Sequence, residues 1–444
     1  MRRTDMRKKV VIVLDVATLS AAQFETWRGR MPSMSALADN GTWRRMRPAF
    51  PALTCSMQTT LLAGKPPADH GVVGNLWFER DLMRLTAWPQ EAGWARGPRI
   101  WNIMRERDPA AVVALLFLQV SRFAGAAVVV GPAPLHTDRG LVPWCYSRPP
   151  GLYESLAGDL GPFDLASFWG PAAGWASTEW IADAALRLLD ERTPDMLVAY
   201  LPHMDYVCQK EGPESAAAME DARRLDDIVG RFAEWCGRWG NAVLFVISEY
   251  GMRAVSGAVP LNRLLRKAGF LEVRRIGDGE YLDYEQSAAF AVTDHQVAHL
   301  YCKDAAKEDV AAFVAELDGV AEVWDERRQR EAEVFHPRCG DLIALSRPDR
   351  WFCYHYWENE DNLPFFARGV DIHNKPGYDP LELFLDRAAG GISLDTGLVK
   401  GSHGLVGDDA RDAAVMLCSE PGLADYAPED FAATQFLGML YRVI

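Results

Sequence analysis

Three apolar runs of the chain are each followed closely by an acidic side chain, at Asp15, Asp205 and Glu249. Such runs predict buried strands of a parallel sheet, whose carboxyl ends share the edge where α/β proteins bind ligands. We therefore expect the three carboxylates to converge. Thr54 stands in a turn after Pro51, ahead of a helix-like segment, and can be presented at the same edge. A hydroxyl beside carboxylates indicates a metal-activated alkoxide nucleophile.

His403 and Asn75 extend this candidate site. His403 lies in a Gly-Ser-His-Gly segment, and imidazoles together with carboxylates bind divalent ions. Two such ions about 3.5–4 Å apart clamp the attacking and leaving oxygens of phosphoryl transfer. The amide of Asn75 suits a non-bridging phosphate oxygen. Thr54 and Asp15 also fit plain roles as helix caps, a common use of these residue types.

The elements that must position these residues follow a βαβ rhythm. Short apolar runs alternate with helical segments, which predicts an α/β fold with a mostly parallel central sheet flanked by helices. The expected strands are residues 10–14, 111–118, 196–201, 242–247 and 414–417, and the expected helices are residues 34–40, 56–63, 100–107, 177–189, 216–239 and 432–441.

The core is expected in two parts. Residues 1–284 form the first part, and residues 336–444 form the second part, which carries the late histidine. A turn-rich aromatic excursion at about 130–170 is expected to cover the strand edges. Alternating strands and a helix predict a small inserted α+β module over residues 285–335.

Composition narrows the functional class. The chain of 444 residues is 49% hydrophobic and 24% charged, and its net charge of −14 argues against binding nucleic-acid polymers or anionic membranes. Eight cysteines without a CxxC pair indicate reduced thiols. The basic start lacks the long apolar core of a signal peptide, and the apolar stretch at 110–134 is too interrupted to span a bilayer. We therefore expect a cytoplasmic protein; the sequence indicates no oligomeric state.

The ordered motifs carry a family resemblance. The chain resembles the alkaline phosphatase superfamily and, within it, the type I phosphodiesterase / nucleotide pyrophosphatase branch. The resemblance runs from about residue 10 to the C-terminus. It rests on Asp15, the Pro-x-Leu-Thr turn that ends at Thr54, residues 62–71, the Ser-Glu-Tyr-Gly segment at 248–251 and the Gly-Ser-His-Gly segment at 401–404.

This resemblance implies two divalent metal ions, with Zn²⁺ the first expectation, and a small phosphorylated substrate. It implies the following roles: Asp15, Thr54 and Glu249 hold one ion, Asp205 and His403 hold the other, and Asn75 contacts phosphate.

The chain departs from the family pattern at two positions. Tyr250 stands where the family has a histidine, and Gln209 stands where it has the histidine four residues after Asp205. Each ion loses an imidazole, which leaves room for a harder ion such as Mn²⁺ or Mg²⁺. Direct or indirect ligation by Gln209 and Tyr250 stays open. The candidate replacements are His203, His295, Asp371 and His373.

The resulting hypothesis is a metal-dependent phosphohydrolase, a phosphodiesterase or nucleotide pyrophosphatase, in which Thr54 forms a phospho-threonine intermediate. One alternative is a phosphonate hydrolase on the same scaffold. Another is a degenerate, non-catalytic binder of a phosphoryl ligand, motivated by Gln209 and Tyr250. Sulfatases need a modifiable Cys or Ser at the nucleophile position, and Cys55 is one place removed.

Overall fold

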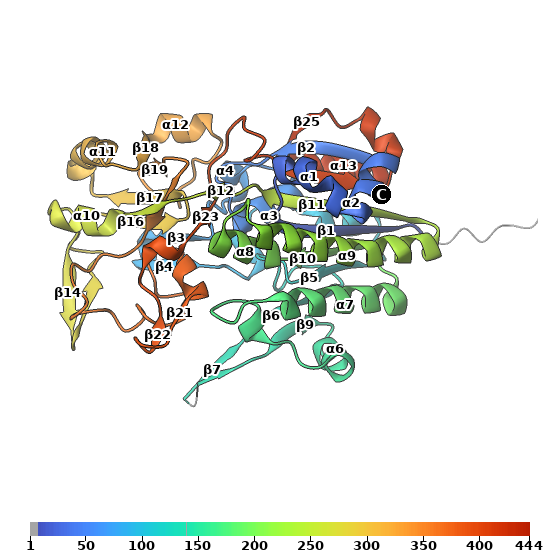
Figure 1. Ribbon diagram of the computed structural model, residues 1–444, viewed down its shortest axis with the longest axis horizontal. Coiled ribbons are helices and arrows are strands. Elements are labelled where there is room, and N and C mark those ends of the chain that lie inside the picture. Colours follow the sequence, from blue (N-terminus) through green and yellow to red (C-terminus); the bar gives the residue numbers. More distant parts are fainter. Residues whose placement is uncertain (1–7, 139) are drawn as a thin grey trace, which may run out of the picture.

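The main body is a nine-stranded sheet flanked by helices, seen in a computed structural model that describes residues 8–138 and 140–444 (Figure 1). The strand order is β25-β2-β24-β11-β1-β10-β5-β6-β9. This confirms the mostly parallel α/β fold predicted from the sequence. The bounds are β1 Val10–Thr18, β2 Thr42–Arg47, β5 Val113–Leu116, β6 Val128–Pro132, β9 Cys145–Arg148, β10 Met196–Leu201, β11 Ala242–Tyr250, β24 Ala414–Cys418 and β25 Asp430–Ala432.

Strand β1 is the centre of this sheet. It pairs in parallel with β10 on one side and with β11 on the other, and every residue of β1 is buried. A strand enclosed in this way must be almost continuously apolar, which explains why the sequence signal was clear there. Strand β24 pairs antiparallel with β11, whereas β10, β5 and β6 continue the parallel part.

The helices follow local sequence signals. Helix α9 begins after Ser215, whose side chain accepts a hydrogen bond from the N–H of Ala218, and ends at Gly240, whose φ of 80° suits glycine. The α-helices are α1 Ala21–Trp27, α2 Pro32–Asn40, α3 Thr54–Ala63, α4 Pro67–His70, α5 Ile100–Arg107, α6 Leu152–Leu160, α7 Trp175–Arg192, α8 His203–Glu211, α9 Ala216–Trp239, α10 Leu261–Lys267, α11 Lys307–Ala315, α12 Glu326–Glu331 and α13 Phe436–Val443.

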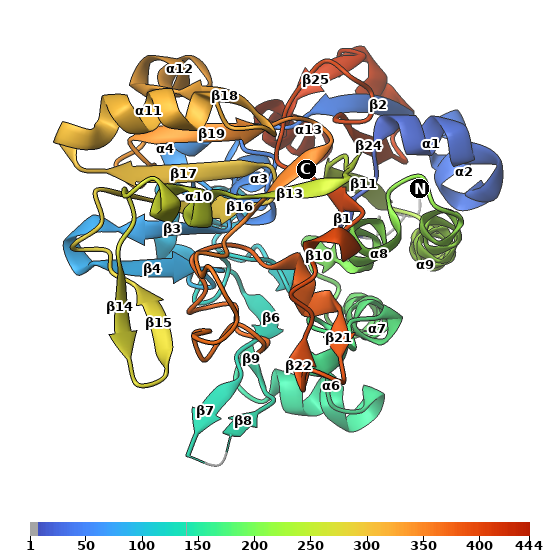
Figure 2. The same cartoon turned by 60° about the vertical axis from the view of Figure 1, so that its left-hand side comes forward.

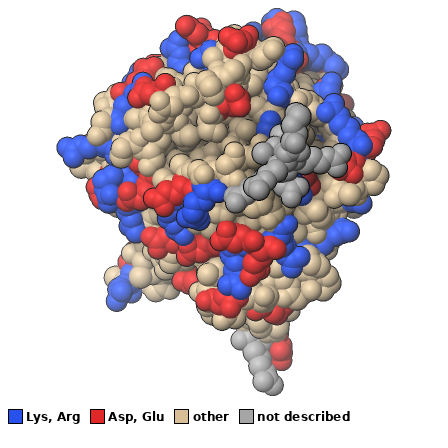
Figure 3. Space-filling view, turned by 90° about the vertical axis from the view of Figure 1, so that its right-hand side faces the viewer, with Lys and Arg blue, Asp and Glu red and all other residues tan. Residues whose placement is uncertain are grey.

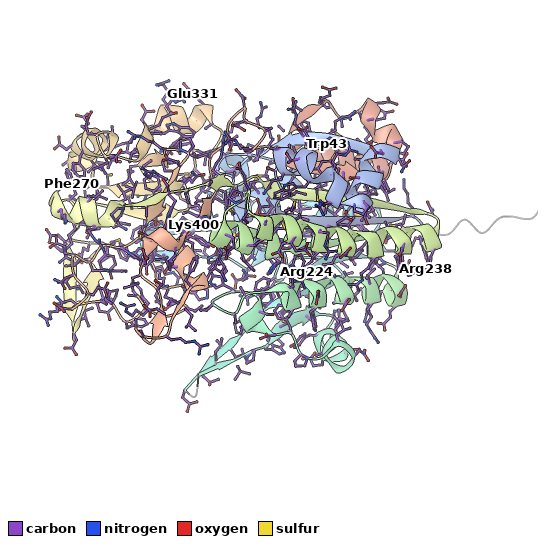
Figure 4. The ribbon with its side chains drawn as sticks, viewed as in Figure 1. Trp43, Arg224, Arg238, Phe270, Glu331 and Lys400 are labelled. Carbon is purple, nitrogen blue, oxygen red and sulfur yellow. The ribbon has the colours of Figure 1, made fainter. Side chains whose placement is uncertain are left out.

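Helices α7 and α9 are joined by a polar and aromatic contact. Arg224 of α9 points toward α7, where its guanidinium pairs with Glu179 at 3.3 Å and lies over the ring of Trp175 (Figure 4). Both helices also contact the strands beneath them. This layer holds α8, and therefore Asp205, against the carboxyl end of the sheet.

A second sheet forms a separate layer of strands with its own core (Figure 2). It is antiparallel, in the order β16-β17-β19-β18, and α11 packs on β18 and β19. An inserted module was expected over 285–335, yet β19 lies between β17 and β18, so this sheet also uses residues beyond 335. Its strands are β16 Ala289–Asp294, β17 Val297–Cys302, β18 Val320–Trp324 and β19 Leu342–Ser346.

The excursion expected at about 130–170 contributes to the main sheet. Strands β6 and β9 pair antiparallel and form its edge, and the hairpin of β7 and β8 projects from the body (Figure 1). The remaining strands are β3 Leu76–Glu79, β4 Arg84–Ala87, β7 Leu135–Thr137, β8 Gly140–Val142, β12 Arg253–Ala254, β13 Gly257–Pro260, β14 Val273–Ile276, β15 Gly279–Leu282, β20 Arg350–Cys353, β21 Leu385–Asp386, β22 Gly391–Ile392 and β23 Gly401–Ser402.

The surface carries charges of both signs. On the face shown in Figure 3, Lys and Arg side chains are interspersed with Asp and Glu. All eight cysteines are free thiols. None of the helices in the described ranges combines the length and the apolar character that a bilayer-crossing helix requires.

Candidate functional site

Two acidic side chains come from neighbouring strands at the carboxyl edge of the main sheet. Asp15 of β1 pairs in register with Ile247 of β11, and Glu249 lies two residues further along β11. Residues two apart on a strand face the same side, so the two carboxylates share one face. The strands continue past these acids, to Thr18 and Tyr250, instead of ending at them as the sequence suggested.

The third acid, Asp205, lies in the first turn of α8, just after β10. All three acids are buried, with exposed fractions of 1% for Asp15, 7% for Asp205 and 0% for Glu249. Among the described residues, no Lys or Arg forms an ion pair with any of them. The structure thus gathers three carboxylates in a dry environment that lacks a basic side chain to offset them.

Thr54 is the first residue of α3 and is 3% exposed. Its hydroxyl lies 2.9 Å from the phenol oxygen of Tyr250 and adjoins the carboxyl of Glu249, where it partly opposes the rise in pKa that burial imposes on that group. A helix N-terminus carries a partial positive charge and free N–H groups, so an anionic phosphoryl group is favoured there. The position of Thr54 combines a hydroxyl with this electrostatic preference.

Asp205 is held by Gln209 and Tyr250, the two positions where the motifs suggested a departure from the family pattern. Gln209 donates from Nε2 to Asp205 Oδ2, and the phenol of Tyr250 donates to Asp205 Oδ1 over 3.4 Å. Tyr378 in turn donates to Gln209 Oε1 at 2.8 Å. Both carboxylate oxygens of Asp205 are therefore engaged by protein donors.

Four aromatic rings form a column beside Asp205. The ring centroids are 3.8 Å apart for Tyr250 and His403, 3.7 Å apart for His403 and His295, and 3.9 Å apart for His295 and Tyr378. His295 comes from the turn between β16 and β17, so the second sheet contributes directly to the site. Of the proposed replacement residues, His295 is thus brought to the site.

His403 is positioned by the turn that precedes Thr54. Its Nδ1 lies 2.8 Å from the carbonyl oxygen of Ala52 and donates to it, which leaves Nε2 as the acceptor nitrogen. Nε2 is buried without a hydrogen-bond partner, 3.7 Å from Asp205 Oδ1. The segment that carries His403 is tied to α8, because the N–H of Lys400 donates to the carbonyl of Gln209 at 2.8 Å.

Asn75 orients the nucleophile turn. Its Oδ1 accepts the N–H of Cys55 at 2.9 Å, and its Nδ2 donates to Asp294 Oδ1 at 3.2 Å. The backbone N–H of Asn75 donates to the other oxygen of Asp294 at 2.8 Å. Asn75 thus connects α3 to the second sheet, a role that the sequence did not reveal.

Gln58 is a further site residue that sequence reasoning missed. It donates to Glu249 Oε1 at 2.8 Å and accepts the N–H of Gln119 at 2.8 Å. Gln58 follows Thr54 by four residues in α3, and residues spaced in this way lie on one face of a helix. The spacing of four residues between Thr54 and Gln58 is the signal in the sequence that could have identified Gln58 as a site residue.

Burial shifts the pKa values of the site residues. It raises the pKa of Asp15 well above its usual range, and burial together with the charge of Asp15 does the same for Glu249. Burial also raises the pKa of Asp205 to about 7, opposed by the hydrogen bonds from Gln209 and Tyr250. Burial lowers the pKa of His403 to about 3. The site therefore disfavours ionised groups unless a cation offsets the acids.

The donor set fits one cation better than two. Within the described part of the chain, no three His, Cys, Asp or Glu side chains are grouped to hold a metal ion. Asp15 Oδ1 and Glu249 Oε2 are nevertheless buried without partners, and the hydroxyl of Thr54 adjoins Glu249. These oxygens suit a divalent cation. Each oxygen of Asp205 already accepts one hydrogen bond, and His403 is the one other ligand that the resemblance assigns there, so the residues present do not fit a comparable second site.

The other candidates take different roles. His203 pairs through Nε2 with Asp221 Oδ2 at 3.0 Å and packs on Trp175. Asp371 accepts the N–H of His373 at 3.0 Å, and His373 is exposed. The segment that contains them reaches the site through Tyr378 instead.

A comparison with known protein families shows to which family the chain belongs. The sequence model of the family described as type I phosphodiesterase / nucleotide pyrophosphatase matches residues 10–379. The chain belongs to this family. The match includes Asp15, Thr54, Asp205 and Glu249, whereas His403 lies beyond it. Membership confirms the resemblance stated from the motifs.

A curated relative and two solved structures show how far the similarity extends. Ectonucleotide pyrophosphatase/phosphodiesterase family member 1 of Rattus norvegicus is 22% identical over 240 residues, which cover 52% of this chain and 23% of that protein. Matches to the curated relatives span less than half of their lengths. Activity, substrates and partners therefore belong to the proposal below.

The solved structures share the fold across nearly the whole chain. Phosphonoacetate hydrolase from Sinorhizobium meliloti 1021, in complex with phosphonoformate, has a TM-score of 0.65 and 17% identity and covers 99% of this chain and 96% of its own. An inactive variant of murine ectonucleotide pyrophosphatase / phosphodiesterase 5, in complex with AMP, has a TM-score of 0.61 and 13% identity, with coverage of 98% and 94%. At these identities the likeness shows the fold alone.

Proposed function

We propose that this chain is a cation-dependent phosphohydrolase that cleaves a phosphodiester or a nucleotide pyrophosphate through Thr54. The observation that carries the proposal is the buried hydroxyl of Thr54 at the N-terminus of α3, which adjoins Glu249, together with the buried unpartnered oxygens of Glu249 and Asp15. Family membership supports the reaction class. The AMP and phosphonoformate bound by the structural neighbours support a small phosphorylated substrate.

The chemistry proceeds in two displacements. Thr54 Oγ1 gives up its proton to solvent and attacks phosphorus, the bond from phosphorus to the leaving oxygen breaks, and the leaving oxygen takes up a proton from solvent. Water then attacks the phosphorylated threonine, the bond between phosphorus and Oγ1 breaks, and one proton of that water passes to Oγ1. The α3 N-terminus favours the anionic phosphoryl group throughout.

Asp15, Glu249 and Thr54 are the residues that would hold the cation. A bound divalent ion supplies positive charge that stabilises the ionised hydroxyl and the phosphoryl oxygens. The residues of the chain supply position: Gln58 fixes Glu249, and Asn75 holds the N–H of Cys55 beside the nucleophile. The identity of the ion, Zn²⁺ or a harder Mn²⁺ or Mg²⁺, is part of the proposal.

Hydrolysis of bis-p-nitrophenyl phosphate across Mg²⁺, Mn²⁺ and Zn²⁺ tests the proposal. Wild-type protein should turn over the diester and Thr54→Ala should not. Thr59→Ala is the matched control, because the hydroxyl of Thr59 bonds within α3 to the carbonyl of Cys55. Acid quenching during turnover should trap one p-nitrophenyl phosphoryl group on the peptide that contains Thr54, identified by mass spectrometry.

Three experimental outcomes would contradict the proposed function or favour one of its alternatives. Undiminished turnover by Thr54→Ala would remove the nucleophile. Release of phosphate from phosphonoacetate without diester cleavage would favour the phosphonate hydrolase. Binding of AMP without turnover under any of the three ions would favour the non-catalytic binder.

We also propose a reducing, cytoplasmic location. It is supported by the eight free cysteines, six of which are buried. Fractionation of the native cells tests this proposal; recovery with exported proteins would contradict it.

A further inference from the structure

Asp15 and Glu249 lie on one side of the acidic cluster, and Asp205 lies on the other. The two sides differ in which carboxylate oxygens lack a hydrogen-bond partner. On one side, Asp15 Oδ1 and Glu249 Oε2 are fully buried and have no hydrogen-bond partner. Their residues are 1% and 0% exposed. A buried carboxylate oxygen without a donor is costly, so these two atoms together point to a cation between them.

On the other side, the oxygens of Asp205 are already occupied. Gln209 and Tyr250 donate to them, and Tyr378 holds the amide of Gln209 in that orientation. An ion at Asp205 would have to share these oxygens with both donors. Of the ligands that the family resemblance assigns to this side, only His403 Nε2 remains without a partner.

The column of four aromatic rings adds to the difference between the two sides of the acidic cluster. Tyr250 stacks on His403 with an interplanar angle of 11°, so the phenol oxygen is carried to a point between Thr54 and Asp205. A phenol placed there donates a hydrogen bond to Asp205. The two substitutions, at 209 and 250, therefore act together.

We infer that this chain holds a single tightly bound divalent cation, at Asp15, Glu249 and Thr54, and that the hydrogen-bonded group of Tyr250, Gln209 and Asp205 takes the place of a second ion. The inference rests on the proposed function for the presence of a cation. Because the ligands at this site are carboxylate and hydroxyl oxygens, the ion is of the hard class, Mn²⁺ or Mg²⁺, in preference to Zn²⁺.

Metal stoichiometry tests the inference without reference to turnover. Purified wild-type chain stripped with chelator should take up one equivalent of Mn²⁺ in calorimetric titration, and elemental analysis after dialysis should give the same ratio. Glu249→Gln should lose this uptake. Asp205→Asn is the matched control, since it changes an equivalent carboxylate on the other side and should retain one equivalent.

A gain-of-site variant provides the converse test. Gln209→His/Tyr250→His should raise the stoichiometry to two, and Co²⁺ bound at the new site should show the visible absorption of imidazole ligation. Added Mn²⁺ should also raise the melting temperature of the wild-type chain and leave that of Glu249→Gln unchanged, because a ligand that binds only the folded state stabilises it. Circular dichroism confirms that each variant is folded.

Two equivalents in the wild-type chain, reduced to one in Asp205→Asn, would overturn the inference. So would one equivalent that survives Glu249→Gln and disappears in Asp205→Asn, or no uptake at all. Failure of the proposed function looks different: uptake of one equivalent without hydrolysis of any phosphoryl substrate would leave this inference intact.

Discussion

The hydroxyl of Thr54 and the phenol of Tyr250 lie 2.9 Å apart, although the two residues are 196 positions apart in the chain. The phenol of Tyr250 also lies 3.4 Å from Asp205 Oδ1, so one oxygen contacts both the Thr54 hydroxyl and the Asp205 carboxylate. Tyr250 is thus in direct contact with the proposed nucleophile.

Replacing Tyr250 with phenylalanine tests the importance of this contact. Tyr250→Phe keeps the ring on His403 and removes only the oxygen, so we expect kcat to fall about tenfold with KM little changed. One neutral hydrogen bond contributes about 0.5–1.5 kcal/mol, and 1.4 kcal/mol corresponds to a factor of ten in rate. Steady-state kinetics with bis-p-nitrophenyl phosphate gives both constants. An unchanged kcat would show that the phenol only packs.

Much of the site could be predicted from local sequence. Asp15 and Glu249 follow continuous apolar runs, and a buried parallel strand leaves that signal because both of its faces are covered. The ends of the strands were less accurate: β1 continues to Thr18, because an acidic residue does not by itself interrupt strand pairing. Thr54 was recognisable because a helix follows it immediately.

The parts that could not be predicted depend on distant segments. Asp294 and Asn75 are 219 residues apart, and Tyr378 and Gln209 are 169 apart. Their contacts arise from the packing of the second sheet on the main body, which no local periodicity encodes. The position of β19 within that sheet has the same origin, since strand order is a tertiary property.

Gln58 should be required for stability as well as for the position of Glu249. Gln58→Leu has a similar size but leaves Glu249 Oε1 and the N–H of Gln119 without partners. Each buried unsatisfied group costs about 1–3 kcal/mol, so we expect the free energy of unfolding to fall by about 2–5 kcal/mol. Urea denaturation measures it. A loss below about 1 kcal/mol would mean that water replaces the amide.

Asp294 should make stability depend on pH. Burial raises its pKa to about 7, against 3.8 for an unperturbed Asp, so between these values the folded chain binds a proton that the unfolded chain has released. The folded state is therefore favoured at low pH and loses stability as the pH rises through 7. Relative to Asp294→Asn, which does not titrate, the wild-type chain should lose about 2–3 kcal/mol between pH 5 and pH 8.

Chemical denaturation of both proteins at several pH values tests this expectation. The difference between them isolates Asp294, because Asp15, Asp205 and Glu249 are common to both. Asp318→Asn is the control, since the side chain of Asp318 is 83% exposed and its removal should leave the pH profile unchanged. A wild-type chain whose advantage over Asp294→Asn increases with pH would have the opposite sign and would contradict the assignment.

Lys375 should be essential to the segment that carries Tyr378. Its ammonium lies 2.7 Å from Asp379 and 2.6 Å from Glu382, and all three side chains are at most 3% exposed. Lys375→Met would leave two carboxylates buried without a counter-charge, a change that costs about 3–5 kcal/mol. Replacing all three ions in Lys375→Met/Asp379→Asn/Glu382→Gln removes the unpaired charges, so it should recover most of that loss. Urea denaturation of the two variants compares them, and equal instability would show that the segment depends on hydrogen-bond geometry and not on charge balance.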